Sequence, residues 1–160
     1  MKTRLKKIFF INAILILFDF ISKQIVKNYF TFPFFKYEVI KGFFNLVYVK
    51  NRGVAFGLLR NLNGKHRDIF LIYLPLGIIL IIFLYLISAK KISKFSFIGF
   101  NLIIAGAVGN LIDRYFYGYV VDFIDLYYKN FHWPAFNFAD SYITIGTILL
   151  IIDGIYQKRG

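Results

Sequence analysis

The chain has 160 residues, of which 59% are hydrophobic against roughly 45–50% in ordinary soluble domains, so the composition indicates an integral membrane protein. Its net charge is +12, but the basic residues are scattered among apolar stretches, which argues against a nucleic-acid partner and favours anionic lipid headgroups as counter-charge. The sequence contains no cysteine, which excludes disulfides, thiolate nucleophiles and cysteine-based zinc sites.

Four apolar stretches are long enough to cross a bilayer, because a helix of roughly 20 residues spans the ~30 Å hydrocarbon core. The first resembles a signal peptide, but Asp19 and Lys23 occupy the place of a small-residue cleavage site, so we predict that it is retained. No linker or internal repeat divides the chain, and we expect a single domain over residues 1–160. The predicted spans cover residues 8–26, 69–89, 95–112 and 138–156.

An even number of spans places both termini on one side of the membrane. If the termini are cytoplasmic, the inner segments carry nine Lys and Arg residues, and the outer segments, 29–68 and 113–136, also carry nine. The inner nine lie in far shorter segments, and positive charge close to span ends is typical of the cytoplasmic side. We therefore predict cytoplasmic termini.

The two long outer segments differ in pattern. Residues 38–50 alternate partly between apolar and polar side chains around a turn at Lys41-Gly42, which predicts a small extracytoplasmic sheet. Residues 115–131 are rich in Tyr and Phe, with Trp133-Pro134 beyond, as expected of chain that lies along the headgroup region. Simple packing at the membrane interface is the alternative for both segments.

Polar residues inside or beside the spans are the candidates for chemistry. Asp19 and Lys23 are four residues apart on one helix face, where an ion pair can form. We interpret them as a structural pair, with substrate positioning as the alternative. The stretch from Asn51 to Gly57 brings polar groups and two glycines together, which fits either a tight turn or a substrate-binding loop.

The end of the third span combines small and polar residues. Gly106 and Gly109 permit a close helix approach. Asn110 and Asp113 share a helix face, and structural support is the leading interpretation for Asp113. Arg114 points elsewhere, either to the membrane interface or to another carboxylate.

Asp122 and Asp140 lie at the rim of the spans, where a polypeptide and water can both arrive. A charged residue near the bilayer centre costs about 2.5–3.5 kcal/mol, so carboxylates at membrane depth suggest function. Asn137 is a possible helix cap beside Asp140. If the two carboxyl groups meet, they can share one proton in the manner of an aspartic protease, with no cofactor. A structural hydrogen-bonding role for one of them is the alternative.

Histidines give no sign of a metal site. His66 and His132 lie far apart, outside any clustered ligand pattern, and we interpret them as solvated loop residues. We predict no bound metal.

Five motifs follow one another along the chain. In order they are Asp19 with Lys23, Asn51-x-Gly53-x-Ala55-Phe56-Gly57, Gly109-Asn110-x-x-Asp113-Arg114, Val121-Asp122-Phe123 and Phe136-Asn137-x-Ala139-Asp140-Ser141. Together they resemble lipoprotein signal peptidase, the type II or prolipoprotein signal peptidase of bacteria. The resemblance covers nearly the whole chain.

The resemblance implies a multi-pass, inner-membrane aspartyl endopeptidase that cleaves diacylglyceryl-modified prolipoproteins just before the lipidated lipobox cysteine. It implies a membrane all-α fold with a small β element: four transmembrane helices, an extracytoplasmic β-cradle and an interfacial segment, with the active site near the outer face. Asp122 and Asp140 match the catalytic dyad. The residues that match supporting or substrate-binding positions are Asp19, Lys23, Asn51, Gly53, Asn110, Asp113, Arg114, Asn137 and Ala139. The expected partners are prolipoproteins and membrane lipids, no cofactor is expected, and we expect a monomer.

Two other classes compete with this interpretation. A serine/lysine signal peptidase would use Ser22 with Lys23, or Ser141, but adjacent residues diverge on a helix. A small transporter or membrane scaffold would use its carboxylates to carry ions or to support the bundle. The key carboxylates lie at one rim instead of along a path, which argues against transport.

Overall fold

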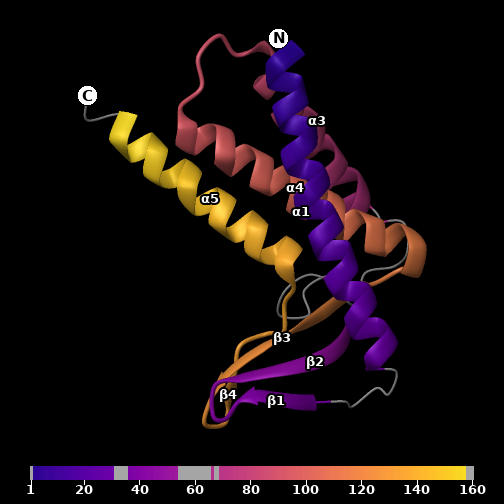
Figure 1. Ribbon diagram of the computed structural model, residues 1–160. Helices are drawn as coiled ribbons and strands as arrows, with labels where there is room; N and C mark the ends of the chain where they lie inside the picture. Colours follow the sequence, from indigo (N-terminus) through magenta and orange to yellow (C-terminus); the bar gives the residue numbers. More distant parts are fainter. Residues whose placement is uncertain (1, 31–35, 54–65, 67–68, 158–160) are drawn as a thin grey trace.

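The computed structural model describes residues 2–30, 36–53, 66 and 69–157 as a helical bundle with a small sheet at one end (Figure 1). Its elements are α1 (Lys2–Tyr29), β1 (Lys36–Ile40), β2 (Phe44–Asn51), the π-helical stretch η2 (Ile69–Tyr73), α3 (Leu74–Ser88), α4 (Lys94–Tyr117), β3 (Val120–Tyr128), β4 (Phe131–His132) and α5 (Phe138–Gln157). Within the described residues, four helical segments are long and apolar enough to cross a membrane: α1, η2 with α3, α4, and α5.

These helices lie where the four spans were predicted, but two of them are longer. Helix α1 runs over Lys2–Tyr29 instead of 8–26, and α4 ends at Tyr117 instead of residue 112. The apolar stretches mark only the part that fits the hydrocarbon, whereas the helices continue through their charged ends. Gly118 ends α4 because its φ of 70° is a left-handed conformation that favours glycine.

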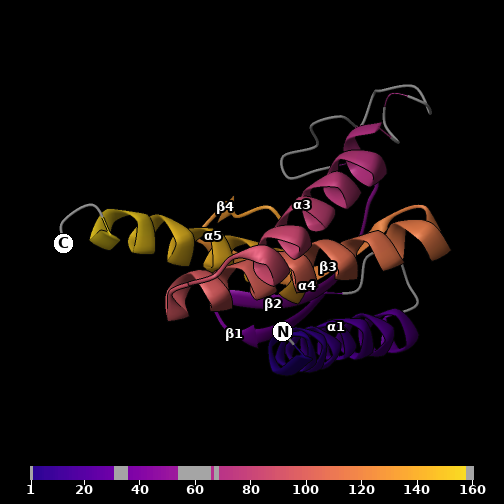
Figure 2. The same ribbon diagram turned by 90° about the horizontal axis from the view of Figure 1, so that it is seen from above.

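Helix α4 is the centre of the bundle and packs against α1, α3 and α5 (Figure 2). Its contact with α5 is very close: a Cβ added to Gly106 would lie 2.3 Å from the carbonyl oxygen of Ala139. One added to Gly146 of α5 would lie 2.6 Å from the oxygen of Gly99. Small residues therefore allow the contact, as in other membrane helix pairs.

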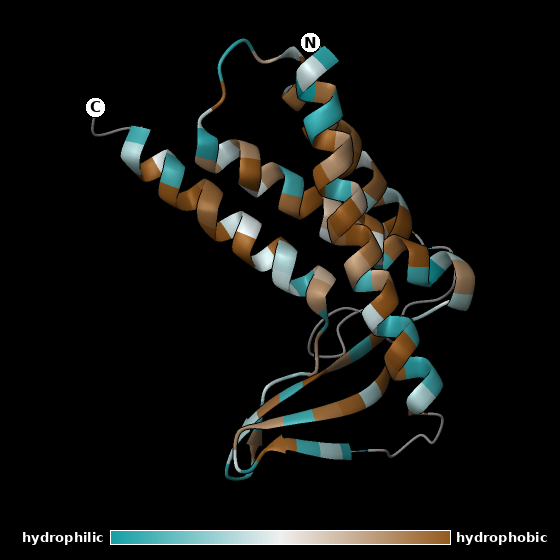
Figure 3. Ribbon diagram, viewed as in Figure 1, coloured by the Kyte–Doolittle hydropathy of each residue, from teal (hydrophilic) through white to brown (hydrophobic). Residues whose placement is uncertain are grey.

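The helices are largely apolar along their length, as Figure 3 shows, and many of their apolar side chains are exposed. Phe9 is 78% exposed and Ile81 is 69% exposed, whereas Asn12 and Asn101 are buried between helices and share a hydrogen bond of 2.7 Å. Lipid is the solvent that suits such a surface, because hydrocarbon accepts apolar side chains and leaves polar groups to pair internally.

The sheet is antiparallel in the order β1-β2-β3-β4 and lies at the opposite end of the bundle from both termini (Figure 1). Gly42, with a φ of 79°, lies in the turn between β1 and β2. The sheet predicted around residues 38–50 is therefore present, but it also takes in much of the stretch 115–131 that was expected along the headgroups. Strand β3 is buried on both faces from Val120 to Phe123, so it lacks the alternation that indicates a half-buried strand.

A small apolar core joins this sheet to the helices. Val121 and Phe123 pack with Val26 of α1. Because successive residues of a strand point to opposite faces, Asp122 faces away from that core. The ring of Phe138, the first residue of α5, lies 4.9 Å from Phe18 and 5.4 Å from Phe123. These contacts fix the strand that carries one carboxylate and the helix that carries the other.

Candidate active site

A buried lysine lies beneath the candidate site. The Nζ atom of Lys23 is 2.8 Å from Asp19 Oδ2 and 3.3 Å from Asp113 Oδ2, and it donates to Asn110 Oδ1 at 3.1 Å. The lysine and both aspartates are fully buried. Breaking such a cluster by removing one partner typically costs about 3–5 kcal/mol, since an uncompensated charge remains. The cluster therefore holds α1 against α4.

The two aspartates of this cluster also fix the segments that carry the candidate dyad. Asp19 Oδ1 accepts a hydrogen bond of 2.8 Å from the backbone N–H of Ala139, next to Asp140. Asp113 Oδ2 accepts one of 2.9 Å from the N–H of Val121, the neighbour of Asp122. Gly109 makes room for this arrangement, because a Cβ there would lie 2.6 Å from Asp19 Oδ2.

Asn137 joins the two carboxyl groups. Its side-chain oxygen accepts a hydrogen bond of 2.9 Å from the backbone N–H of Asp140, and its backbone N–H donates to Asp140 Oδ2 at 3.3 Å. This is the reciprocal pattern of a capping box at the start of α5. Its Nδ2 donates to Asp122 Oδ1 at 2.7 Å. One buried asparagine therefore binds both carboxyl groups.

Two further asparagines complete this network. Asn110 Nδ2 donates to Asp140 Oδ1 at 2.8 Å, so Asn110 links Asp140 to Lys23. Asn51, at the end of β2, donates to Asp122 Oδ2 at 2.9 Å, and its own oxygen accepts from the N–H of Gly53. Both oxygens of each candidate carboxyl group therefore accept hydrogen bonds.

Arg114 lies at the same end of α4 and contacts a backbone carbonyl, whereas the membrane interface or another carboxylate was expected. Its guanidinium donates to the carbonyl oxygen of Gly53 at 3.3 Å, and the structure gives no ion pair for it with a described carboxylate. The remainder of that motif, Ala55–Gly57, lies outside the described residues.

Burial changes the acidity of Asp122, which is only 1% exposed. Loss of hydration and then the nearby charge of Asp140 raise the pKa of Asp122 to about 7, against the opposing effect of the hydrogen bonds from Asn51 and Asn137. A carboxyl group with this pKa gains and loses its proton close to neutral pH, which suits proton transfer.

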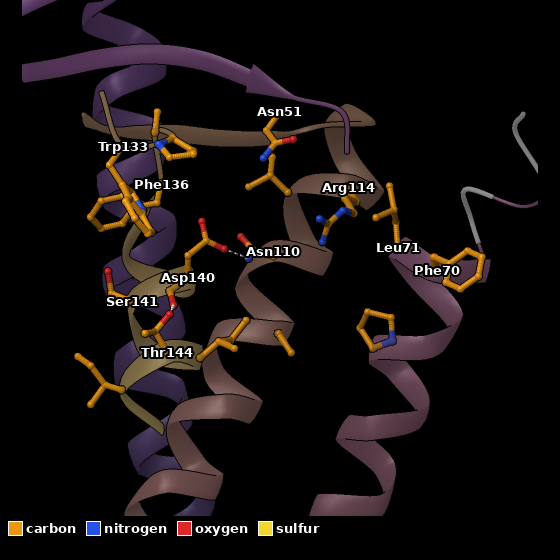
Figure 4. Close-up of a pocket in the computed structure, with 17 residues that line it drawn as sticks. Asn51, Phe70, Leu71, Asn110, Arg114, Trp133, Phe136, Asp140, Ser141 and Thr144 are labelled. Atoms are coloured by element: carbon orange, nitrogen blue, oxygen red, sulfur yellow. Dashed lines mark hydrogen bonds between the residues drawn. The ribbon is translucent and has the colours of Figure 1, made fainter. Parts of the chain in front are cut away.

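A cavity of about 660 Å³ opens beside this network, between α3, α4 and α5 (Figure 4). Asp140, Asn110 and Arg114 line its polar end, whereas Asp122 lies behind the lining. The apolar lining includes Phe70, Leu71, Pro75, Ala107, Phe136, Ile143 and Ile145. The cavity therefore suits a ligand with a long apolar part and a polar group beside Asp140.

No metal site accompanies the cavity in the part of the chain that the structure describes, where no group of three His, Asp or Glu side chains has a suitable arrangement.

Comparison with known proteins identifies the family. The family profile described as "Signal peptidase (SPase) II" matches residues 11–156. The lipoprotein signal peptidase of Solibacter usitatus is 45% identical over 77% of this chain and 75% of its own length. Those of Cupriavidus necator and Burkholderia vietnamiensis are 40% and 43% identical over 94% of this chain, and 83% and 88% of theirs. The chain belongs to the signal peptidase II family.

Solved structures agree with this membership. A bacterial membrane enzyme determined by the in meso method at 2.3 Å resolution has a TM-score of 0.82 and 33% identity, covering 96% of this chain and 90% of that one. Another, at 1.9 Å, has a TM-score of 0.78 and 33% identity and covers 92% of both chains. As a member of the signal peptidase II family with four apolar helices, the chain is a multi-pass membrane peptidase.

All the site residues predicted for this signal peptidase lie in one contact network at the junction of bundle and sheet. The predicted Asp19–Lys23 ion pair and the Asn137 cap are confirmed. The interpretation of His132 as a loop residue is wrong, because His132 lies in β4, where its ring contacts Asp125.

The wall of the cavity escaped prediction. Trp133, Phe136, Ser141 and Thr144 line it, and Figure 4 shows them around Asp140. Their only signal in the sequence is that they lie in or beside the last motif, because no spacing rule predicts that residues 133–136 line a cavity together with α5.

Proposed function

We propose that the chain is an aspartic endopeptidase that removes the signal peptide from diacylglyceryl-modified prolipoproteins, cutting just before the lipidated lipobox cysteine. The observation that carries the proposal is the binding of both Asp122 and Asp140 to Asn137 at the polar end of an apolar cavity. Two carboxyl groups held together can share one proton, which is the arrangement that activates water without a cofactor.

The two carboxyl groups have different surroundings, which suggests separate roles. Asp140 lies in the first turn of α5, where the helix dipole favours negative charge. The raised pKa of Asp122, about 7, allows this carboxyl group to hold a proton at and below neutral pH. Asp140 is therefore the proposed base and Asp122 the proposed acid.

The reaction then proceeds in two steps. Asp140 takes a proton from water while the water oxygen bonds to the scissile carbonyl carbon, and Asp122 gives its proton to the carbonyl oxygen. In the second step the proton on Asp140 passes to the leaving nitrogen, the C–N bond breaks, and Asp122 regains a proton from a diol hydroxyl. Asn51 and Asn137 cover Asp122, so we expect the substrate to displace the Asn51 bond before this transfer.

The cavity fits a substrate that is both lipid and peptide. Its apolar lining suits an acyl chain or an apolar signal segment, and Asn51, Asn110 and Arg114 offer hydrogen bonds to peptide carbonyls at the polar end. Arg114 is suited to this because its guanidinium carries five donors, and among the described residues the structure gives it one long bond, to Gly53.

We further propose that the protein is a single domain over residues 1–160, a monomer with cytoplasmic termini in the bacterial inner membrane, with membrane lipids as its surroundings. The termini lie at one end of the bundle and the dyad lies near the sheet at the other (Figure 1). Cytoplasmic termini, which the charge distribution favours, therefore place the dyad near the outer face.

The contacts argue against the serine/lysine alternative. Ser22 Oγ donates to the carbonyl of Asp19, and Ser141 Oγ donates to that of Asn137. Lys23 is bound to its two aspartates and to Asn110, so the structure shows neither serine bonded to a lysine base. Transport is disfavoured by the grouping of Asp122 and Asp140 at one end of the bundle.

Cleavage of a diacylglyceryl prolipoprotein in proteoliposomes tests the proposal. We expect Asp122→Asn and Asp140→Asn each to lower kcat by roughly 10²–10⁴-fold, the usual contribution of a general acid or base. Asp153→Asn is the matched control, because Asp153 binds Ser93 and Ser96 toward the other end of α5 and an amide oxygen can accept the same bonds. Full turnover by either dyad variant contradicts the mechanism, and loss of activity in Ser141→Ala would favour the serine class.

A further inference from the structure

A second polar network links side chains from all four strands of the sheet. Its β3 members, Asp125 and Tyr127, lie farther along the strand than Asp122. Asp125 accepts a hydrogen bond of 2.7 Å from Asn45 of β2, and its two oxygens lie 2.8 and 3.0 Å from Nδ1 of His132 in β4. Asn45 and Asp125 are buried, whereas the His132 side chain is 45% exposed.

Tyr127 extends this network to β1. Its ring stacks on His132 with centroids 5.0 Å apart and planes within 8°, and its hydroxyl donates to Glu38. The hydroxyl also accepts from the N–H of Gly42 at 2.8 Å. His132 is therefore held by a carboxylate on one side and by an aromatic ring on its face.

The residues after His132 form one wall of the cavity. Trp133, Pro134, Ala135 and Phe136 all line it, and the chain then enters Asn137. Four backbone hydrogen bonds tie the wall to β3. The N–H of Trp133 donates to Leu126 at 2.8 Å and that of Phe136 donates to Ile124 at 3.0 Å, while the Phe136 carbonyl accepts from the N–H groups of Phe123 and Ile124 at 3.0 and 2.8 Å. Strand β4 has only two residues, so its backbone ladder is short, and the His132 side chain supplies a further attachment at its end.

We propose that His132 is a positioning residue: its bond to Asp125 sets the place of the Trp133–Phe136 wall, against which the apolar part of the lipidated substrate packs. The inference rests on the proposed function. His132 is not among the residues that line the cavity, so its expected effect on substrate binding is indirect, through the position of the wall. We expect it to have no effect on the chemical step.

The test compares His132→Ala with His132→Asn in the proteoliposome cleavage assay. Loss of a hydrogen bond to a charged group is expected to raise KM roughly tenfold with kcat little changed. Asparagine places an N–H donor near the position of Nδ1, so His132→Asn should restore KM. Asn130→Ala, an exposed change in the same hairpin, is the control. Asp125→Asn is a milder second variant, which should raise KM less because its amide oxygen can still accept from His132.

A binding measurement gives an independent readout. The chain contains one tryptophan, Trp133, so intrinsic fluorescence reports directly on the wall. Asp140→Asn protein should show a saturable change in fluorescence as the diacylglyceryl prolipoprotein is added. In the double variant that also carries His132→Ala, the midpoint of this binding curve should shift to a higher substrate concentration.

Three outcomes of the cleavage assay overturn the proposal: an unchanged KM in His132→Ala, a lowered kcat with unchanged KM, or no rescue of KM by His132→Asn. Turnover by Asp140→Asn would instead refute the dyad and leave the KM comparison valid.

Discussion

At the residue scale, the site depends on Asn137. Its side chain caps α5 through the N–H of Asp140 and holds Asp122 of β3, so a single amide sets the relation between a helix and a strand. The cap is local in sequence, whereas the bond to Asp122 joins different elements. These two functions of Asn137 can be separated experimentally.

Asn137→Ala and Asn137→Ser separate capping from the link to Asp122. The alanine variant loses both, and we expect it to lower stability by about 1 kcal/mol and to impair cleavage. Serine can still cap the helix but is too short to hold Asp122, so stability should be retained while kcat falls by roughly 10²-fold through misplacement of the acid. Thermal unfolding in detergent and the cleavage assay measure the two effects. A serine variant as active as wild type would show that the link to Asp122 is dispensable.

Local contacts between residues were predictable, and distant ones were not. The Asp19–Lys23 pair and the Asn137 cap follow from spacings of four and three residues. The bond between Asn51 and Asp122 joins residues 71 positions apart, and only folding of the sheet brings them together. Arg114 pairs with a backbone carbonyl, a partner that no charge pattern indicates.

At the element scale, the close contact of α4 with α5 places the dyad. Gly106 lies against the Ala139 carbonyl, one residue before Asp140, and Gly109 lies against the carboxylate of Asp19. The small residues at the end of the third span predicted such an approach, but not which helix it involves. Strand β3 was missed because both of its faces are buried and the alternation of a half-buried strand is absent.

Gly106→Ala tests this helix contact. The new Cβ would lie 2.3 Å from the Ala139 oxygen, so the helices must separate, and we expect a loss of about 1–3 kcal/mol in stability together with reduced kcat. Gly154→Ala is the matched control in α5, where an added Cβ meets nothing within 4 Å, and it should be neutral or slightly stabilising. Equal behaviour of the two variants in thermal unfolding and cleavage would contradict the close contact.

At the scale of the whole molecule, the fold places the proposed dyad and the two termini at opposite ends of the bundle. The helices are largely apolar (Figure 3), and the buried polar groups of the candidate site gather where the bundle meets the sheet. Composition and charge alone predicted the four spans and favoured one orientation. They could not predict the cavity, because the three helices and the segment 133–136 that line it meet only in the folded protein.

Single introduced cysteines test the orientation against a background that contains none. Lys41→Cys lies in the turn between β1 and β2, and Lys90→Cys lies between α3 and α4, at the other end of the bundle. In cells whose outer membrane has been made permeable and whose inner membrane is intact, a maleimide that cannot cross the inner membrane should label position 41 and not position 90. Labelling of position 90 alone would show that the protein has the opposite orientation.

The central claim is that Asp122 and Asp140 share one catalytic proton, and the pH dependence of kcat/KM tests it most directly. Burial and the charge of Asp140 raise the pKa of Asp122 to about 7, so Asp122 holds its proton below that pH and loses it above. We predict that kcat/KM falls as the pH rises through about 7, because Asp122 then loses the proton that it must donate. A kcat/KM that stays constant between about pH 5 and about pH 9 would contradict the shared proton.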